Sequence, residues 1–236
     1  MPPAVFKDLC ADVTAAGDTA RFGRFWAGVL GLTLEETPDD DPGRLTGATP
    51  ERTVWLNAVP EPRTAKTRLH LDVMLPAADP APLVALGARV VSEPDGEKHW
   101  WVLADPEGTL FCAMGPHPQY TPSAPEPFEL VVDAADPWAQ AQWWAAATGG
   151  QAERKDETPW AWVEGAAGFP WRYWVFAAVP EPKTVKNRWH WDVTTPDPQL
   201  LVDRGARVLR KPDDEVRWWV LADPEGNEFC AFTPDR

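Results

Sequence analysis

The chain has 236 residues, 36 of them acidic and 22 basic, which gives a formal net charge of −14 and a pI of about 4.7. This charge disfavours a nucleic acid or an anionic membrane surface as the partner. The N-terminus has no basic start followed by an apolar run, no apolar stretch approaches the length of a membrane span, and three Cys are too few for a disulfide framework. We therefore expect a soluble, cytoplasmic protein with reduced thiols.

The predicted elements of the first half follow the order strand, helix, three strands, and this order then repeats. Asp18 is a good N-cap for a helix that Gly31 ends, and Pro80 and Gly87 bound a second, shorter helix. Residues 105–108, Asp-Pro-Glu-Gly, match a type I turn before the last strand. The strands expected in this half span residues 6–13, 32–36, 53–59, 66–75, 88–91, 99–103 and 109–114.

The second half is a duplicate of the first. Residues 100–108 recur letter for letter at 218–226, and residues 87–90 recur at 205–208. Five prolines between residues 115 and 127 are typical of an extended linker. We therefore expect an α+β protein of four βαβββ modules in two domains, 1–116 and 126–236, joined by a Pro-rich linker at 117–125.

A longer repeat, residues 59–73 and 179–193, contains two of the four His at the same position. Read as a strand, each copy has one apolar face and one polar face. The polar faces carry Lys66, Arg68, His70 and Asp72 in the first copy and Lys186, Arg188, His190 and Asp192 in the second. Such a face is either solvated or the lining of a functional cavity.

Paired βαβββ modules with His-x-Asp on the fifth strand and Asp-Pro-x-Gly before the last strand resemble the vicinal oxygen chelate superfamily. That group includes glyoxalase I, extradiol dioxygenases and bleomycin-binding proteins. The blocks at residues 179–192 and 223–230 look closest to its bacterial glyoxalase-like branch. The resemblance covers nearly the whole chain and implies two tandem glyoxalase-like domains with cupped sheets, but it identifies the fold better than the reaction.

In metal-using members the ligands come from the first strand of each module and from the strand after the Asp-Pro-x-Gly turn, where the last ligand is usually a Glu. The resemblance puts the first-strand position near Asp8 and Leu130, and the usual Glu is replaced by Cys112 or Cys230. The first copy could supply the ligand set Asp8, His70 and Cys112. If the modules pair in swapped order, the set is Asp8, His190 and Cys230, whereas the second copy alone supplies only His190 and Cys230. We therefore expect no stoichiometric metal, and Asp8, His70 and Cys112 as the ligands if a divalent metal does bind. The alternative for both Cys is a small buried hydrophobe.

Tryptophan is concentrated in the second copy, where 11 of the 15 lie at or after Trp138. If even two of them face a cavity, they form a stacking wall for a planar ligand, whereas core filling is the alternative for each one. We expect the second copy to be the main ligand site. Besides the four cations of the polar faces, the substrate-binding residues expected there are Trp160, Trp162, Trp174, Trp219, Glu228 and Cys230.

The leading functional prediction is a metal-independent enzyme of lyase, isomerase or cyclase type acting on a bulky or aromatic small molecule. His190 acts as general acid or base, Asp192 holds substrate or water, and Lys186 and Arg188 hold an anionic or enolate oxygen. His70, Asp72, Lys66 and Arg68 take the same parts in the first copy. Two alternatives stay open: a non-catalytic resistance or carrier protein that sequesters an aromatic natural product, and a metal-dependent glyoxalase or dioxygenase-type enzyme. The expected partner is an aromatic or anionic small molecule, bound by a monomer or homodimer.

Overall fold

The computed structural model describes residues 1–14, 18–35 and 43–234. The predicted order of strand, helix and three strands is present in all four modules, which confirms the α+β prediction. The first half contains β1 (Val5–Thr14), α1 (Thr19–Leu30), β2 (Thr33–Glu35), β3 (Arg44–Thr46), a 3-10 turn (Pro50–Arg52), β4 (Val54–Val59), β5 (Leu69–Met74), α2 (Ala81–Leu86), β6 (Arg89–Ser92), β7 (Trp100–Ala104) and β8 (Leu110–Met114). The second half contains β9 (Glu126–Ala134), α3 (Pro137–Thr148), β10 (Gln151–Arg154), β11 (Trp160–Glu164), β12 (Tyr173–Ala178), β13 (Trp189–Thr194), α4 (Gln199–Val202), β14 (Arg207–Arg210), β15 (Trp219–Ala222) and β16 (Glu228–Phe232).

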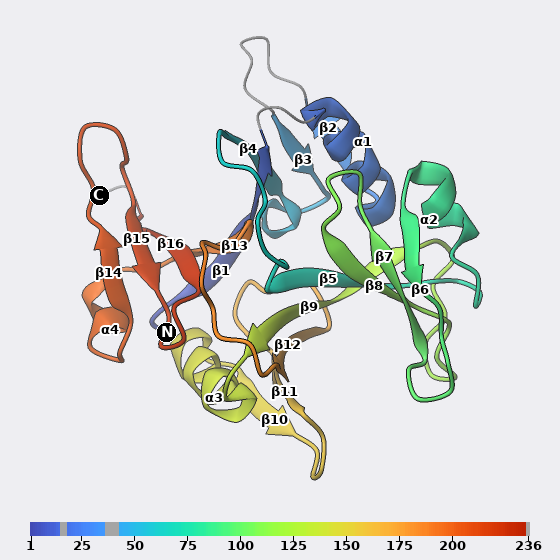
Figure 1. The fold of residues 1–236 in the computed structure, drawn as a ribbon. Coiled ribbons are helices and arrows are strands. Elements are labelled where there is room, and N and C mark those ends of the chain that lie inside the picture. The colour runs from blue at the N-terminus through green and yellow to red at the C-terminus, as the bar shows by residue number, and fades with distance from the viewer. Residues whose placement is uncertain (15–17, 36–42, 235–236) are drawn as a thin grey trace.

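The two sheets each take strands from both halves of the sequence. The first, which we call sheet A, has the order β14-β15-β16-β13-β1-β4-β3-β2, and the second, sheet B, has the order β10-β11-β12-β9-β5-β8-β7-β6. Sheet A therefore joins the first module to the fourth, and sheet B joins the second to the third. Figure 1 shows this as blue strands beside orange and red ones in sheet A, and green beside yellow in sheet B. The predicted ranges 1–116 and 126–236 delimit the sequence repeats, and each repeat contributes one module to each sheet.

The middle of each sheet is an antiparallel pair of strands from different halves of the chain. β1 pairs with β13 in sheet A, and β9 pairs with β5 in sheet B. The residues that lie directly opposite each other are Asp8 and Asp192, and Cys10 and His190, in sheet A, and Glu129 and Asp72, and Val131 and His70, in sheet B. Asp8 and Glu129 thus hold equivalent positions, and so do Cys10 and Val131.

The repeated Val-Pro-Glu-Pro segments are the crossovers between the sheets. Residues 60–68 lead from β4 in sheet A to β5 in sheet B, and residues 179–188 lead from β12 in sheet B to β13 in sheet A. The Pro-rich stretch 117–125 joins β8 to β9 within sheet B. Because β5 begins at Leu69 and not at residue 66 as predicted, Lys66 and Arg68 belong to a crossover and not to the strand.

Helices α1 and α3 pack on the apolar faces of the strands. The Asp18 carboxylate accepts a hydrogen bond from the Arg21 backbone N–H, and Gly31 ends α1 in the left-handed conformation at a φ of 65°. Asp136 caps α3 in the same way by accepting from the Ala139 N–H. These caps satisfy backbone groups that a helix leaves free at its ends, as the sequence predicts.

A buried hydrogen bond ties each of these helices to the following module. Trp26 Nε1 in α1 donates to Asp105 Oδ2 at 3.0 Å, and Trp144 Nε1 in α3 donates to Asp223 Oδ2 at 3.2 Å. Both carboxylates also accept from backbone N–H groups of their own Asp-Pro-Glu-Gly turn. The repeated turn therefore anchors a helix as well as reversing the chain.

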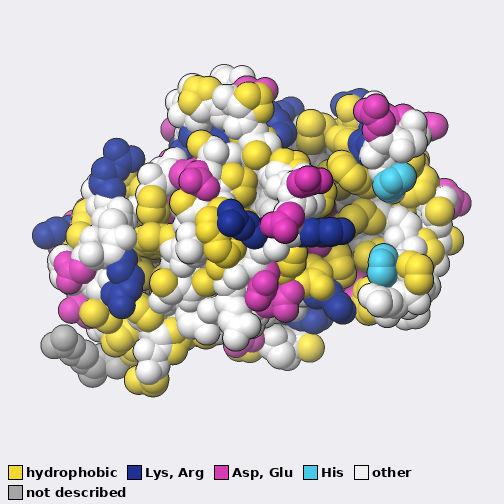
Figure 2. All heavy atoms as spheres, turned by 90° about the horizontal axis from the view of Figure 1, so that it is seen from below, with side chains coloured by type: hydrophobic (Ala, Val, Ile, Leu, Met, Phe, Trp, Pro, Cys, Tyr) yellow, Lys and Arg dark blue, Asp and Glu magenta, His cyan; other side chains and the backbone are white. Residues whose placement is uncertain are grey.

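Charged side chains are dispersed over the surface visible in Figure 2. On the face shown in Figure 2, acidic and basic side chains are interspersed among apolar ones, so this view shows no continuous basic surface for a nucleic acid over the residues described. No helix within residues 1–14, 18–35 and 43–234 is long and apolar enough to cross a membrane.

Candidate functional site

The polar rows predicted for β5 and β13 lie on the sheet faces turned away from the core. Leu69, Leu71 and Val73 belong to the core cluster, whereas His70 and Asp72 alternate with them and lie outside it. In β13 the core takes Trp189, Trp191 and Val193, and His190 and Asp192 lie on the other face. The strand alternation expected from the sequence is therefore present in both copies.

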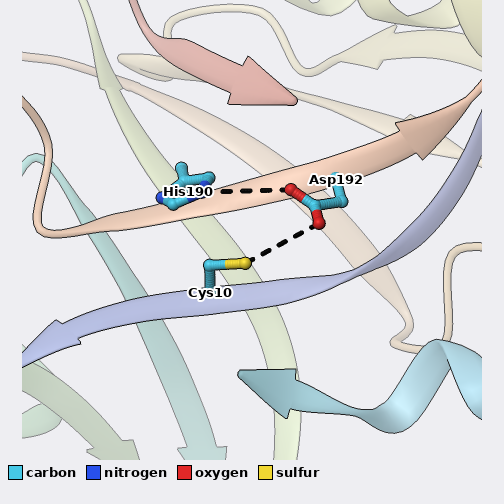
Figure 3. Close-up of side chains that lie close together, drawn as sticks. All are labelled: Cys10, His190 and Asp192. Carbon is cyan, nitrogen blue, oxygen red and sulfur yellow. Dashed lines mark hydrogen bonds and ion pairs between the residues drawn. The ribbon is translucent and has the colours of Figure 1, made fainter. Parts of the chain in front are cut away.

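In sheet A, a thiol, an imidazole and a carboxylate lie together at the junction of β1 and β13 (Figure 3). Cys10 Sγ donates to Asp192 Oδ2 at 3.7 Å, and His190 Nε2 is 3.9 Å from Asp192 Oδ1. Cys230 Sγ, from β16, is 3.7 Å from His190 Nε2. The swapped pairing of modules left open by the sequence is the one that brings Asp8, His190 and Cys230 into one sheet.

Asp8 extends this cluster along β1. Its Oδ2 accepts from Lys7 Nζ at 2.5 Å and from Trp55 Nε1 at 3.0 Å, and Lys7 Nζ also lies 3.8 Å from Asp192 Oδ2. Oδ1 of Asp8 and Oδ1 of Asp192 are buried and have no hydrogen-bond partner among the residues described. Buried carboxylate oxygens without partners are costly, so a bound cation or hydrogen-bond donor would stabilise this cluster.

Burial controls the protonation of this cluster. Desolvation lowers the pKa of His190 to about 4, so its imidazole is neutral at pH 7. Desolvation, followed by the nearby Asp8 charge, raises the pKa of Asp192 well above its ordinary value. Burial likewise raises the pKa of the Cys10 and Cys230 thiols, because a thiolate would be poorly solvated beside these carboxylates.

The sheet A cluster fits a divalent metal. The ligand atoms of Cys10, His190 and Asp192 all lie within 4.8 Å of one another. Ligand atoms around a tetrahedral Zn²⁺ lie roughly 3.3–3.7 Å apart, and mixed S, N and O donors are ones that Zn²⁺ accepts. The contacts of 3.7–3.9 Å within the cluster need only small movements to reach that spacing. The expectation that no metal binds is therefore not supported, because a plausible ligand group is present.

The ligand set predicted from the first copy, Asp8, His70 and Cys112, is not assembled. Asp8 lies in sheet A, while His70 and Cys112 lie in sheet B. Leu130, placed at the first-strand ligand position, is fully buried in the core. The true equivalent of Asp8 is its neighbour Glu129, because Glu129 lies opposite Asp72 just as Asp8 lies opposite Asp192.

Sheet B holds a related group that lacks a counterpart of the Cys10 thiol. His70 Nε2 is 3.2 Å from Asp72 Oδ1, and Cys112 Sγ is 3.8 Å from His70 Nε2. Glu129 lies across the strand pair from Asp72. Desolvation, reinforced by the Asp72 charge, raises the pKa of Glu129 to about 8. The ligand atoms of His70, Asp72 and Cys112 also lie within 4.8 Å of one another, so sheet B holds a second candidate metal group. Val131 occupies the place that Cys10 holds in sheet A, so this group has one thiol where sheet A has two, Cys10 and Cys230.

The aromatic wall predicted around His190 belongs to the other sheet. Trp162 lies opposite Val175, Val175 opposite Val131, and Val131 opposite His70, so Trp162 and His70 share one row and one face of sheet B. Trp160 lies two residues away and is 42% exposed, and Trp162 Nε1 donates to Glu164 Oε1 at 2.9 Å. The expectation that the second copy alone builds an aromatic site around His190 is therefore wrong, because the third module pairs with the second.

Two other predicted ligand-stacking residues lie in the core. Trp174 is fully buried and stacks on Phe169, with ring centroids 5.2 Å apart and planes 3° apart. Trp219 packs against the core cluster, whereas Trp218 stacks on Phe232 on the face that carries Cys230. Trp218 and Trp219 therefore lie on opposite faces, and Trp219, the one predicted to bind substrate, is on the core side.

The four predicted anion-binding cations lie in the crossovers, where they bond to protein groups. Lys186 pairs with Asp12, and Lys66 Nζ is 2.9 Å from Asp133 Oδ2. Arg68 donates to the Glu181 carbonyl oxygen at 2.7 Å, and Arg188 donates to the Glu61 carbonyl oxygen at 3.0 Å. Each Arg thus joins its own crossover to the other one.

Glu228, predicted to bind substrate, also supports a crossover. It accepts from Lys183 Nζ at 2.7 Å and from the Asn187 backbone N–H at 3.2 Å. Cys10 and Glu129 are the functional candidates that the sequence reasoning missed. The alternation Asp8, Cys10, Asp12 along the first strand carries the signal for Cys10, and aligning Asp12 with Asp133 identifies Glu129.

Comparison with known proteins agrees with this arrangement. A family model described as "Glyoxalase-like domain" matches residues 8–114 and 129–232, and so begins at Asp8 in one copy and at Glu129 in the other. The chain belongs to this glyoxalase-like family. The resemblance to the vicinal oxygen chelate superfamily is thereby confirmed. No curated protein matches the chain.

Solved structures share the fold of this glyoxalase-like protein at low sequence identity. A glyoxalase I variant from Zea mays superposes with a TM-score of 0.66 and 16% identity, covering 98% of this chain and 94% of that one. A putative dioxygenase from Bacillus subtilis gives a TM-score of 0.64 and 15% identity, covering 98% of this chain and 86% of that one. At such identities the likeness shows the fold and leaves the reaction to be argued from the site.

Proposed function

We propose that this glyoxalase-like protein is an enzyme of isomerase or lyase type that moves a proton on a small carbon acid, such as an enolisable ketone or aldehyde. The reaction takes place on the polar face of sheet B. The observation that carries the proposal is the group formed there: Glu129 directly opposite Asp72, with His70 Nε2 3.2 Å from Asp72 Oδ1. An acid and an imidazole at adjacent positions are the parts that general acid–base catalysis needs.

Each residue of this group has a distinct role. Glu129 removes a proton from the carbon next to the carbonyl and returns it at the end of the reaction. Its pKa of about 8 makes the ionised form a stronger base than an ordinary Glu and keeps a large protonated fraction near neutral pH. His70 donates a hydrogen bond from Nδ1, the ring nitrogen that is not turned toward Asp72, to the carbonyl oxygen as negative charge develops on it.

The aromatic residues of the same face favour a flat substrate. Trp162 lies in the same cross-strand row as His70, and Trp160 is half-exposed beside it. Burying an aromatic ring against such side chains contributes about 25 cal/mol per Å² of apolar area before the cost of ordering is subtracted. We therefore expect an aromatic carbonyl compound to be a better substrate than a small aliphatic one.

A divalent metal, if bound, would be held in sheet A by Cys10, His190 and Asp192, and it would supply Lewis-acid polarisation of a substrate oxygen. Because of this donor set, the sheet A cluster is a second candidate active site, for a metal-dependent reaction separate from the one proposed in sheet B. Lys7 and Trp55 would then fix Asp8 beside the metal ligands through the hydrogen bonds that they already make. The neutral imidazole of His190 is in the protonation state that metal binding requires.

The test measures carbon-acid chemistry directly. Phenylpyruvate, an aromatic and enolisable keto acid, is incubated with the protein in D₂O, and deuterium at its C3 position is followed by proton NMR. The proposal predicts exchange above the uncatalysed rate, reduced by about 100-fold or more in Glu129→Gln. Phenylpyruvate and a panel of aromatic aldehydes and ketones should also be tested for saturable quenching of Trp fluorescence. Quenching by these compounds without deuterium exchange would support a sequestering protein and contradict the proposed enzyme.

A further inference from the structure

A cavity of about 800 Å³ lies where the two crossovers meet. Its walls come from equivalent positions of both repeats, including Asp12 and Asp133 at the ends of β1 and β9. A molecule in this cavity would therefore touch both sheets at once. The cavity lies beyond the clusters around His70 and His190, which do not line it.

Five of the 22 basic residues of this acidic chain line the cavity: Arg63, Lys66, Arg68, Lys186 and Arg188. Lys66 and Lys186 pair with Asp133 and Asp12, yet more than half of each lysine side chain is exposed, at 54% and 58%. The Nε atom of Arg68 is buried without a partner among the residues described. Four acidic residues, Asp12, Glu61, Asp133 and Glu181, line the cavity too, so its basic residues exceed its acidic ones by one. The donating capacity of these cations is only partly used.

Arg63 is the member of this set with no hydrogen-bond or ion-pair partner in the described part of the chain. Its equivalent in the second repeat is Lys183, which pairs with Glu228 at 2.7 Å and does not line the cavity. The first repeat has Leu110 in place of Glu228, so the acid that neutralises Lys183 has no counterpart beside Arg63. The duplication therefore leaves one cation unneutralised on one side of the cavity.

The turn of residues 105–108 positions the Arg63 side chain. A Cβ added to Gly108 would lie 2.7 Å from a terminal guanidinium nitrogen of Arg63, so the guanidinium rests against bare backbone. Gly108 also has a φ of 80°, a conformation that other residues rarely adopt. A planar guanidinium held against a rigid turn is well suited to a bidentate contact with a carboxylate or phosphate.

We propose that the crossover cavity is a binding site for a small anionic molecule that carries a phosphate or carboxylate group on an apolar body. The anionic group bonds to Arg63, and Lys66 and Lys186 contribute from the two crossovers. The apolar body packs on Pro60, Pro62 and Pro182, which line the same cavity. This site is separate from the catalytic group of sheet B, so its existence does not depend on the proposed reaction.

The test compares phenyl phosphate with inorganic phosphate by isothermal titration calorimetry at constant ionic strength in chloride buffer. Phenyl phosphate should bind at one site per chain with a Kd of about 0.1–1 mM, and about tenfold more tightly than inorganic phosphate because the phenyl ring is buried. Arg63→Ala should weaken binding by about 10- to 100-fold, since a charge-assisted hydrogen bond is lost. Lys183→Ala, which removes the same charge at the equivalent position outside the cavity, should leave the Kd within about twofold.

A second variant tests the duplication argument itself. Leu110→Glu gives the first repeat the acid found in the second. It should neutralise Arg63 and weaken the binding of phenyl phosphate as much as Arg63→Ala does. Absence of saturable binding by the wild type at 10 mM ligand (roughly ten times the weakest Kd expected) would overturn the proposal. Equal weakening by Arg63→Ala and Lys183→Ala would also overturn it, because it would show a general charge effect. Glu129→Gln should bind phenyl phosphate like the wild type, which separates this site from the proposed reaction.

Discussion

Glu129 lies directly opposite Asp72 across the antiparallel pair of β9 and β5. Asp8 holds the same relation to Asp192 across β1 and β13. The next opposed pair differs, because Cys10 faces His190 in sheet A while Val131 takes that place in sheet B. The carboxylates and imidazole are thus present in both sheets, and the cluster of sheet A has a second thiol that the group of sheet B lacks. Each site therefore supplies a matched control for experiments on its counterpart.

Glu129 makes stability fall as the pH rises. Its pKa in the folded protein, about 8, is above the ordinary value of 4.5, so the folded state holds this proton more tightly than the unfolded chain. The stability gained from that proton is complete below pH 4.5 and is lost as the pH rises through 8. Glu129→Gln should remove this dependence and gain roughly 1–3 kcal/mol relative to the wild type between pH 5 and pH 8.5.

Urea unfolding at pH 5, 6.5 and 8.5 provides the measurement. His190 acts in the opposite direction, because its lowered pKa of about 4 makes stability fall as the pH drops below 6.5. The difference between wild type and Glu129→Gln is therefore the quantity to compare. A difference that stays constant from pH 5 to pH 8.5 would show that Glu129 titrates normally.

The metal-ligand cluster predicts selective binding in sheet A. Protein stripped with chelator and loaded with Co²⁺ should bind about one Co²⁺ per chain and show an intense thiolate-to-metal charge-transfer band, because a Cys ligand is deprotonated on binding. Cys10→Ser should lose the band and weaken metal affinity by about tenfold or more. Cys112→Ser, the thiol of the less donor-rich sheet B, should keep both. A band that survives Cys10→Ser and disappears in Cys112→Ser would place the metal in the other sheet.

The turn carboxylate of the second half is a stability hot spot. Asp223 accepts from Trp144, Gln140 and the Asn227 side chain, and also from two backbone N–H groups of its turn. Asp223→Ala would leave these buried donors without an acceptor and should cost about 3–5 kcal/mol. Asp213→Ala, on the surface, should leave the urea midpoint nearly unchanged. If the two variants unfold at the same urea concentration, the buried network does not hold α3 in place.

The exchange of modules predicts how fragments behave. A fragment of residues 1–116 would expose the edges of β1 and β5 that pair with β13 and β9 in the intact chain. Unpaired strand edges of this kind drive aggregation or pairing with another chain. We expect the fragments 1–116 and 126–236 to be unstable or oligomeric alone and to form a 1:1 complex when refolded together, as measured by size-exclusion chromatography and circular dichroism. Two monomeric fragments that each unfold cooperatively would contradict this.

Local features were accessible from the sequence because they depend on neighbouring residues. The cap of α1 by Asp18, the turn at Asp105 and the alternation around His70 and His190 follow from spacing and residue type. The pairing of modules depends instead on which strand edges meet. Two homologous repeats offer similar strand edges, so sequence periodicity cannot choose between pairing within a repeat and pairing across repeats.

The wrong predictions at the site have two causes. One is the ambiguity in module pairing, and the other is a shift of one residue in the alignment of a strand. Trp160 and Trp162 lie in the same half of the sequence as His190, which predicts a shared site, but sheet B places them with His70. The sequence comparison places Leu130 at the position of Asp8, but Leu130 is a core side chain and the next residue toward the N-terminus, Glu129, lies on the polar face. In a strand such a shift moves every side chain to the opposite face.

The central claim is that Glu129 is the catalytic acid–base group, and its equivalent position in sheet A gives the most direct test. Deuterium exchange at C3 of phenylpyruvate should be measured for wild type, Glu129→Gln and Asp8→Asn under identical conditions. We predict a loss of about 100-fold or more for Glu129→Gln, and a change of less than about threefold for Asp8→Asn, because Asp8 lies in the other sheet. Full exchange activity in Glu129→Gln, or a larger loss in Asp8→Asn, would contradict the assignment of the reaction to sheet B.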